Sequence, residues 1–124
     1  MKKLFVSVPM KGRTEDEIKA SIAKMKSFAE LCEGEELELI DSYIEETPPE
    51  NCNIPVWYLA KSIEKMTHAD VFITIDDAWE WNGCDIENSV AAKYGIKRLY
   101  VNAEYVIPNY RLLIEKCVPA PTSY

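Results

Sequence analysis

The sequence lacks the features that would place it in several common classes. No apolar run approaches the roughly 20 residues of a membrane-spanning helix, and the start, MKKLFVSV, is too short and too soon polar for a signal peptide. The chain has one histidine, and its four cysteines are far apart, with no CxxC pair. We therefore expect a soluble, cytoplasmic protein with reduced thiols, no metal site, no cofactor and no disulfide framework.

Basic residues are scarce relative to acidic ones. The 124 residues include 14 Lys and Arg against 21 Asp and Glu, which gives a formal net charge of -7. A nucleic-acid surface needs clustered cations, so we expect no nucleic-acid partner, and no membrane partner either. The Walker pattern GxxxxGK[ST] and the dinucleotide fingerprint GxGxxG are also missing. The length and the 48% hydrophobic content allow one core, so residues 1–124 are interpreted as a single domain.

Strands and helices are predicted to alternate in the first half of the chain. The run KLFVSVP (3–9) predicts a strand, and the capping-box pattern TEDE (14–17) opens a helix that Gly34 would end. Its expected buried stripe is Ile18, Ile22, Met25, Ala29 and Cys32. LELID (37–41) predicts a weaker strand, and the Pro-rich and acidic segment 42–53 predicts a long loop that could act as a lid.

The second half continues the alternation. Asn53 is a candidate N-cap with Pro55 in the first turn, followed by a helical stripe of Val56, Leu59, Ile63 and Met66. DVFITI (70–75) predicts a strand buried on both faces. Ile86, Val90 and Tyr94 predict another helix, ended by Gly95, before the strand KRLYV (97–101) and a last helix around 110–116. This order predicts an α/β fold with a doubly wound parallel sheet and helices on both faces.

Ligands of such sheets bind beyond the carboxyl ends of the strands, where the strand order reverses. Three segments of the chain are expected there: SVPMKGR (7–13), DSYIEETPP (41–49) and DDAWEWNGCDIE (76–87). In the first, Lys11 and Arg13 flank Gly12 at a helix N-terminus, which favours binding of an anion such as a phosphate. A solvated turn with two surface cations is the alternative.

The third segment holds the strongest candidate for chemistry. With Asn82 as a plausible N-cap and Gly83 allowing a tight backbone, Glu87 falls about one turn inside a helix. It shares a face with Val90, Ala91 and Tyr94, which we expect to pack on the sheet, so its carboxylate would lie in a partly apolar cleft. A poorly solvated carboxylate is suited to act as a nucleophile. The alternative is an exposed glutamate in a first helical turn.

Other residues near this segment could contribute to a site. Asp76 and Asp77 could orient a ligand or act as an acid, or they could simply form a turn. Trp79 and Trp81 could stack on a base or cover the cleft. Cys84 has no histidine partner that would make it a nucleophile, and His68 is interpreted as structural.

Three of these stretches together resemble the nucleoside 2-deoxyribosyltransferase superfamily, which includes deoxynucleoside monophosphate N-glycosidases and small phage-like members. They are VSVPMKG (6–12), ADVFITIDD (69–77) and GCDIENSVAAKYGIK (83–97), and the likeness covers roughly residues 2 to 101. The resemblance implies a flavodoxin-like α/β/α sandwich of about five strands. It also implies a homodimer or higher homo-oligomer, in which a neighbouring subunit completes each site.

The resemblance also assigns roles to residues. Glu87 matches the nucleophile that attacks the anomeric carbon of 2-deoxyribose. The resemblance does not assign the acid; from its position at the end of the third strand Asp77 is the candidate, with Glu80 as the alternative. The expected ligand is a nucleoside or a nucleotide, and Lys11 favours a nucleotide because it lies where monophosphate-specific members carry a phosphate-binding arginine. The remaining candidate substrate-binding residues are Ser7, Pro9, Met10, Gly12, Tyr43, Asp76, Trp79, Gly83 and Cys84.

Two positions depart from the family pattern. The enzymes usually carry a tyrosine in the first strand or its loop, where this chain has Phe5, and an aspartate eight residues before that of ADV, where it has Ser62. A non-catalytic nucleotide-binding or sequestering protein is therefore the alternative function. A phosphoacceptor signalling domain is a third class with this fold, but it would need an acidic pair after the first strand. The segment there, SVPMKGR, is basic, so this class is disfavoured.

Overall fold

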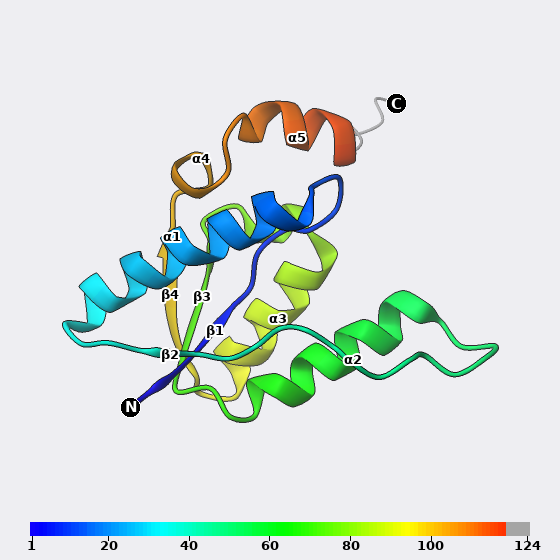
Figure 1. The fold of residues 1–124 in the computed structure, drawn as a ribbon, viewed down its shortest axis with the longest axis horizontal. Helices are drawn as coiled ribbons and strands as arrows, with labels where there is room; N and C mark the ends of the chain where they lie inside the picture. Colours follow the sequence, from blue (N-terminus) through cyan, green and yellow to red (C-terminus); the bar gives the residue numbers. More distant parts are fainter. Residues whose placement is uncertain (119–124) are drawn as a thin grey trace.

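In the computed structural model, the residues that the structure describes, 1–118, form four β-strands and five α-helices (Figure 1). The strands are β1 (Lys3–Val6), β2 (Glu38–Leu39), β3 (Val71–Ile75) and β4 (Lys97–Val101). The helices are α1 (Glu15–Glu33), α2 (Ile54–Met66), α3 (Asn82–Lys93), α4 (Ala103–Val106) and α5 (Tyr110–Cys117). A short 3-10 helix, Ala78–Glu80, precedes α3.

All the strand pairs are parallel, and the order across the sheet is β2-β1-β3-β4. The chain moves from β1 to β2 on one side and then returns to β3 on the other, so the direction of winding reverses between β1 and β3. This confirms the predicted α/β fold with a parallel sheet. The order is consistent with a flavodoxin-like fold, in which ligands bind at this reversal.

Side chains of the two central strands alternate between two hydrophobic cores because successive residues of a strand point to opposite faces. Leu4, Val6, Val71, Ile73 and Ile75 pack with α1, α4 and α5. Phe5 and Phe72 stack with ring centroids 5.9 Å apart and pack with Met66 of α2 and Ala91 of α3. The predicted burial of β3 on both faces is confirmed, since all five of its residues are buried.

The ends of α1 and α2 were predictable from local chemistry. The Thr14 side chain accepts from the amide of Glu17, whose carboxylate accepts in turn from the Thr14 amide, and Gly34 closes α1 in the left-handed conformation. Asn53 caps α2 by accepting from the Val56 amide. Segment 42–53 has no helix or strand, and together with α2 it extends away from the sheet (Figure 1).

The predicted burial of α3 is confirmed for Glu87 and Ala91 but was wrong for Ile86 and Tyr94. Ile86 and Tyr94 are 41% and 80% exposed, whereas the buried residues of α3 are Cys84, Glu87 and Ala91. The aromatic rings of Phe5 and Phe72 fill the space below the helix, so a small side chain, Ala91, faces them. The predicted stripe of Ile86, Val90 and Tyr94 was chosen from the large apolar residues alone, and Ile86 and Tyr94 of this stripe lie on the exposed face of the helix. Cys32 of α1 and Val56 of α2 were likewise expected in buried stripes and are exposed.

Two elements follow β4. The short helix α4 was not predicted; Asn102 caps it by accepting from the amides of Glu104 and Tyr105. The last predicted helix corresponds to α5. None of the helices in residues 1–118 is both long and apolar enough to cross a bilayer.

Candidate functional site

Glu87 is held in a buried polar cluster just beyond the carboxyl ends of β1 and β3. The Ser7 hydroxyl donates to Glu87 Oε1 over 2.7 Å, although the two residues are 80 positions apart in the sequence. Glu87 is only 8% exposed and Ser7 only 2% exposed. The structure therefore brings two sequence-predicted site residues together where the winding of the sheet reverses.

The alternation of β1 explains how Ser7 reaches α3. Ser7 follows the last residue of β1, and its amide donates to the Ile73 carbonyl over 2.9 Å, so the strand geometry extends to it. Its side chain therefore lies on the same side of the sheet as Phe5. Ala91, one turn beyond Glu87, packs in the Phe5 cluster and seats α3 on the sheet. The packing of Ala91 against Phe5 and Phe72 thus fixes the distance between α3 and the sheet, and it brings Glu87 within hydrogen-bonding distance of Ser7.

The environment of Glu87 opposes its ionisation. Burial raises the pKa of the Glu87 carboxyl, and hydrogen bonds with the hydroxyls of Ser7 and of Ser62 on α2 reduce that rise. Desolvation penalises a charge, while donors to the carboxylate stabilise it. The hydroxyls of Ser7 and Ser62 are therefore the groups that favour the charged form a nucleophile needs.

Cys84 and Thr74 complete the cluster. Burial raises the pKa of the Cys84 thiol to about 12, and the neighbouring Glu87 carboxylate adds to this, against the effect of the Ser7 and Thr74 hydroxyls. The Thr74 hydroxyl, fully buried on β3, lies beside Cys84 but makes no hydrogen bond of good geometry. Cys84 is consequently a neutral thiol, which agrees with the expectation that it is no nucleophile.

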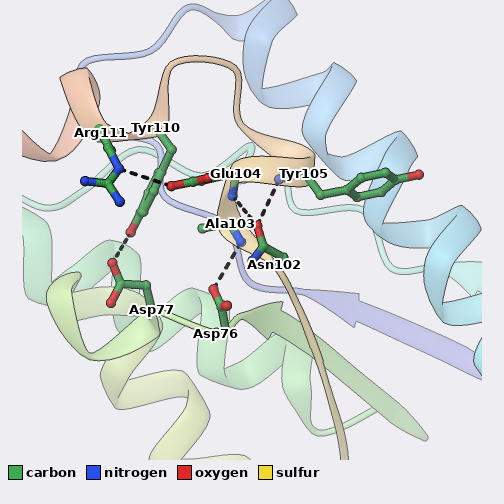
Figure 2. Close-up of polar contacts among 8 residues, drawn as sticks. All are labelled: Asp76, Asp77, Asn102, Ala103, Glu104, Tyr105, Tyr110 and Arg111. Atoms are coloured by element: carbon green, nitrogen blue, oxygen red, sulfur yellow. Dashed lines mark hydrogen bonds and ion pairs between the residues drawn. The ribbon is translucent and has the colours of Figure 1, made fainter.

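A second polar group lies where β3 and β4 end (Figure 2). Asp76 Oδ1 accepts from the Ala103 amide over 3.0 Å, and Asp77 Oδ2 accepts from the Tyr110 hydroxyl over 2.8 Å. Tyr110 also accepts from the indole N–H of Trp81 over 3.0 Å. Burial raises the pKa of Tyr110, helped by Asp77. Trp81 is therefore part of a buried hydrogen-bonded chain that anchors the segment before α3 to α5.

Two hollows open beside this chain. One has a volume of about 290 Å³ and is lined by Asp76, Asp77, Asn102, Ala103, Glu104 and Tyr110. The other, of about 330 Å³, is lined by Asp77, Glu104, Tyr110, Arg111, Ile114 and Glu115. Asp77 lines both hollows, whereas Glu87 lines neither. The two carboxyl groups therefore lie in different places, Asp77 at the hollows and Glu87 in the buried cluster with Ser7.

The loop after β1 is held by α1 and α5. Arg13 donates to the carbonyls of Pro9 and Glu17 and to the Ser21 hydroxyl, so its guanidinium closes the loop onto α1. Lys11 Nζ donates to the Cys117 carbonyl over 3.4 Å, and the Cys117 thiol donates back to the Lys11 carbonyl. The expectation of two free cations at this loop was wrong, because Arg13 donates to three protein groups and Lys11 donates to one.

The other candidate residues are placed around these groups. Pro9 is buried, whereas Met10, Tyr43 and Trp79 are 49%, 70% and 69% exposed. Gly83 lies in the first turn of α3, where Trp81 takes the N-cap position expected for Asn82. A Cβ at Gly83 would meet nothing within 4 Å, and its φ is not positive, so the backbone does not require glycine here.

Sequence reasoning missed three contributors. Ser62 was noted only as a departure from a family pattern, and Thr74 and Tyr110 were not considered as site residues. A period-two reading of β1 and β3 would have placed Ser7 and Thr74 on the face of Phe5 and Phe72. Tyr110 gave no such signal, because its partner Asp77 is 33 residues away.

The described part of the chain contains no group of three or more His, Cys, Asp or Glu side chains arranged to hold a metal ion. Comparisons with protein-family models, with curated proteins and with solved structures find no match to this chain.

Proposed function

We propose that the protein is an N-glycosyl transferase or hydrolase that acts on 2-deoxyribosyl nucleosides or nucleotides through Glu87. The observation that supports this most is the buried Glu87 carboxyl group, hydrogen-bonded by Ser7 at the reversal of a parallel sheet. The resemblance of the surrounding segments to nucleoside 2-deoxyribosyltransferases supplies the substrate class.

In the proposed reaction, the Glu87 carboxylate bonds to the anomeric carbon while the bond from that carbon to the base nitrogen breaks. The electron pair leaves with the base, which takes a proton from an acid, and an oxocarbenium-like transition state is stabilised by the carboxylate. Water or a second base then attacks the same carbon while the bond from that carbon to the Glu87 oxygen breaks, and the proton lost by the attacking group returns to the acid. Asp77, which lines the hollows at the end of β3, is our candidate acid.

Lys11 is our candidate for contact with a 5′-phosphate, because its exposed amino group makes one long hydrogen bond, to the Cys117 carbonyl, whereas the Arg13 guanidinium makes three to protein groups. A Lys11→Ala variant should raise KM for 2′-deoxynucleoside 5′-monophosphates at least about tenfold and leave KM for the nucleosides unchanged, because only the former carry the charge that Lys11 would bind. Equal effects on both ligands would exclude a phosphate-specific role.

We also infer, on the same resemblance, a flavodoxin-like α/β/α sandwich of about five strands and a homo-oligomer with sites near subunit interfaces. The widely spaced cysteines separately support a cytoplasmic location. These inferences are independent of the catalytic assignment. Sedimentation measurements of the purified protein would test the oligomer.

A binding protein without catalysis is the second candidate. Phe5, at the position where the resemblance expects a tyrosine, is stacked on Phe72 in the core and carries no hydroxyl. Burial also raises the pKa of Glu87, which disfavours the ionised nucleophile. On this hypothesis the cluster binds a nucleotide without cleaving it.

The two candidates are separated by incubating the protein with deoxynucleosides and their 5′-monophosphates and following free base by chromatography. Glu87→Gln keeps the size of the side chain, and Asp85→Asn, an exposed carboxylate of the same helical turn, is the matched control. The proposal expects base release that Asp85→Asn retains and Glu87→Gln reduces at least about a thousandfold. Release that survives Glu87→Gln would exclude the mechanism, and thermal stabilisation by a nucleotide without release would favour the binding protein.

A further inference from the structure

Ser7, the residue that follows β1, connects this strand to Glu87 through a side-chain hydrogen bond. Its amide is bonded to the Ile73 carbonyl of the neighbouring strand, so its backbone is fixed by the sheet. Its side chain is almost completely buried and donates to Glu87 Oε1 over 2.7 Å. A serine hydroxyl has one hydrogen to donate, and here Glu87 receives it.

This geometry gives Ser7 a role different from substrate contact. A hydrogen bond to an ionised carboxylate is shorter and stronger than one between neutral groups, and it favours the charged form. In a buried site the effect is larger because water does not compete for the carboxylate. The hydroxyl therefore acts on the ionisation and the orientation of Glu87 rather than on a ligand.

The other groups that face Glu87 come from two helices. Ser62 of α2 provides a second hydroxyl and does not titrate. Cys84, on the same helix as Glu87, is the titratable neighbour, and its thiol stays neutral because burial raises its pKa to about 12. The ionisation of Glu87 is thus governed by its burial and by two hydroxyls, of which Ser7 belongs to the rigid sheet.

We propose that Ser7 is a positioning residue, whose buried hydroxyl at the end of β1 fixes the Glu87 carboxylate and keeps it ionised for nucleophilic attack. The catalytic part of this inference rests on the proposed function, whereas the effect of Ser7 on Glu87 does not.

The test is a pH titration of the Glu87 carboxyl carbon by nuclear magnetic resonance in protein labelled with ¹³C at glutamate, with Glu87→Gln to identify the signal. Ser7→Ala removes the donor with little change of size and should make Glu87 about tenfold weaker as an acid, so its titration moves to higher pH. Ser7→Thr restores a hydroxyl and should move the titration back. Thr74→Val is the matched control, because it removes a buried hydroxyl of the same cluster that makes no hydrogen bond of good geometry, and it should leave Glu87 unchanged.

An unchanged Glu87 titration in Ser7→Ala would overturn the proposal, and so would an equal change in Thr74→Val. Thermal unfolding of each variant establishes first that it folds, and if Ser7→Thr does not, the comparison of Ser7→Ala with Thr74→Val decides. Because the titration needs no turnover, its outcome is distinct from failure of the glycosyl-transfer function. Where base release is present, Ser7→Ala should lose rate at low pH and recover it at higher pH, a profile that a purely structural defect would not give.

Discussion

Tyr110 of α5 donates its hydroxyl hydrogen to Asp77 Oδ2 over 2.8 Å and accepts from the Trp81 indole over 3.0 Å. One buried side chain thus links the last helix to both ends of the segment between β3 and α3. Removing the hydroxyl leaves the Trp81 N–H without its acceptor in a buried site.

Tyr110→Phe should therefore lower the free energy of unfolding by about 1–3 kcal/mol. Urea denaturation measures this, and Tyr105→Phe, which alters an exposed tyrosine of α4, is the control and should change stability by less than about 0.5 kcal/mol. Equal stability of the two variants would contradict the anchoring role of Tyr110.

Glu87 should make the protein less stable at neutral pH. Because the pKa of Glu87 is raised on folding, its contribution to the free energy of unfolding is fully present below the unfolded value, 4.5, and is lost as the pH rises through the folded value. Glu87→Gln stays neutral, so it should raise Tm at pH 7 by a few degrees and leave Tm near pH 4 almost unchanged.

The difference in Tm between the unaltered protein and Glu87→Gln, measured as a function of pH, gives the contribution of Glu87 alone. Glu17 and Glu30, whose pKa values are lowered by hydrogen bonds from the backbone amides of Thr14 and Leu37, contribute an opposite trend in both proteins and cancel. A lower Tm for Glu87→Gln at pH 7 would show that the buried carboxylate does not cost stability.

Cys84 should resist alkylation in the folded protein. With a pKa of about 12, its thiolate fraction at pH 8 is very small, and burial blocks access to the reagent. Peptide mapping after brief treatment with iodoacetamide should show exposed Cys32 modified at least about a hundredfold faster than Cys84. Comparable rates would mean that α3 opens readily from the sheet.

Gly12 should be required where the loop after β1 meets α5. Its φ is +76°, and a Cβ built there would lie 2.6 Å from the Cys117 sulfur. Gly12→Ala should cost about 2 kcal/mol of unfolding free energy, and adding Cys117→Ala should recover the part due to the contact. Gly83→Ala is the control and should be neutral or stabilising, because its site is open and helical. Equal costs for the two alanine variants would contradict the close contact.

The sequence signals that succeeded are local ones. Capping by Thr14 and Asn53, the left-handed Gly34 and the continuous apolar run of β3 depend on neighbours within a few residues, and the structure has each of them. Such features are encoded by propensity and hydrogen bonding along a short stretch.

The signals that failed depend on tertiary packing. Ile86 and Tyr94 lie on the exposed side of α3 although both are apolar, because the space above Phe5 and Phe72 accepts the small side chain of Ala91. Arg13 binds Pro9, Glu17 and Ser21 only because the loop folds back onto α1. The sequence predicts that Ser7 and Glu87 both lie beyond the carboxyl ends of the strands. Their hydrogen bond could not be predicted, because it depends on how α3 packs on the sheet.

The central claim is that Glu87 forms a bond to the sugar, and mass spectrometry of the protein trapped with substrate tests it most directly. The protein is mixed with a 2′-deoxynucleoside or its 5′-monophosphate, quenched in acid within the first turnover, digested and analysed by peptide. The account predicts a deoxyribosyl or deoxyribosyl-phosphate adduct on the peptide containing Glu87, absent in Glu87→Gln. Base release with the adduct on another residue, or with equal speed in Glu87→Gln, would contradict it.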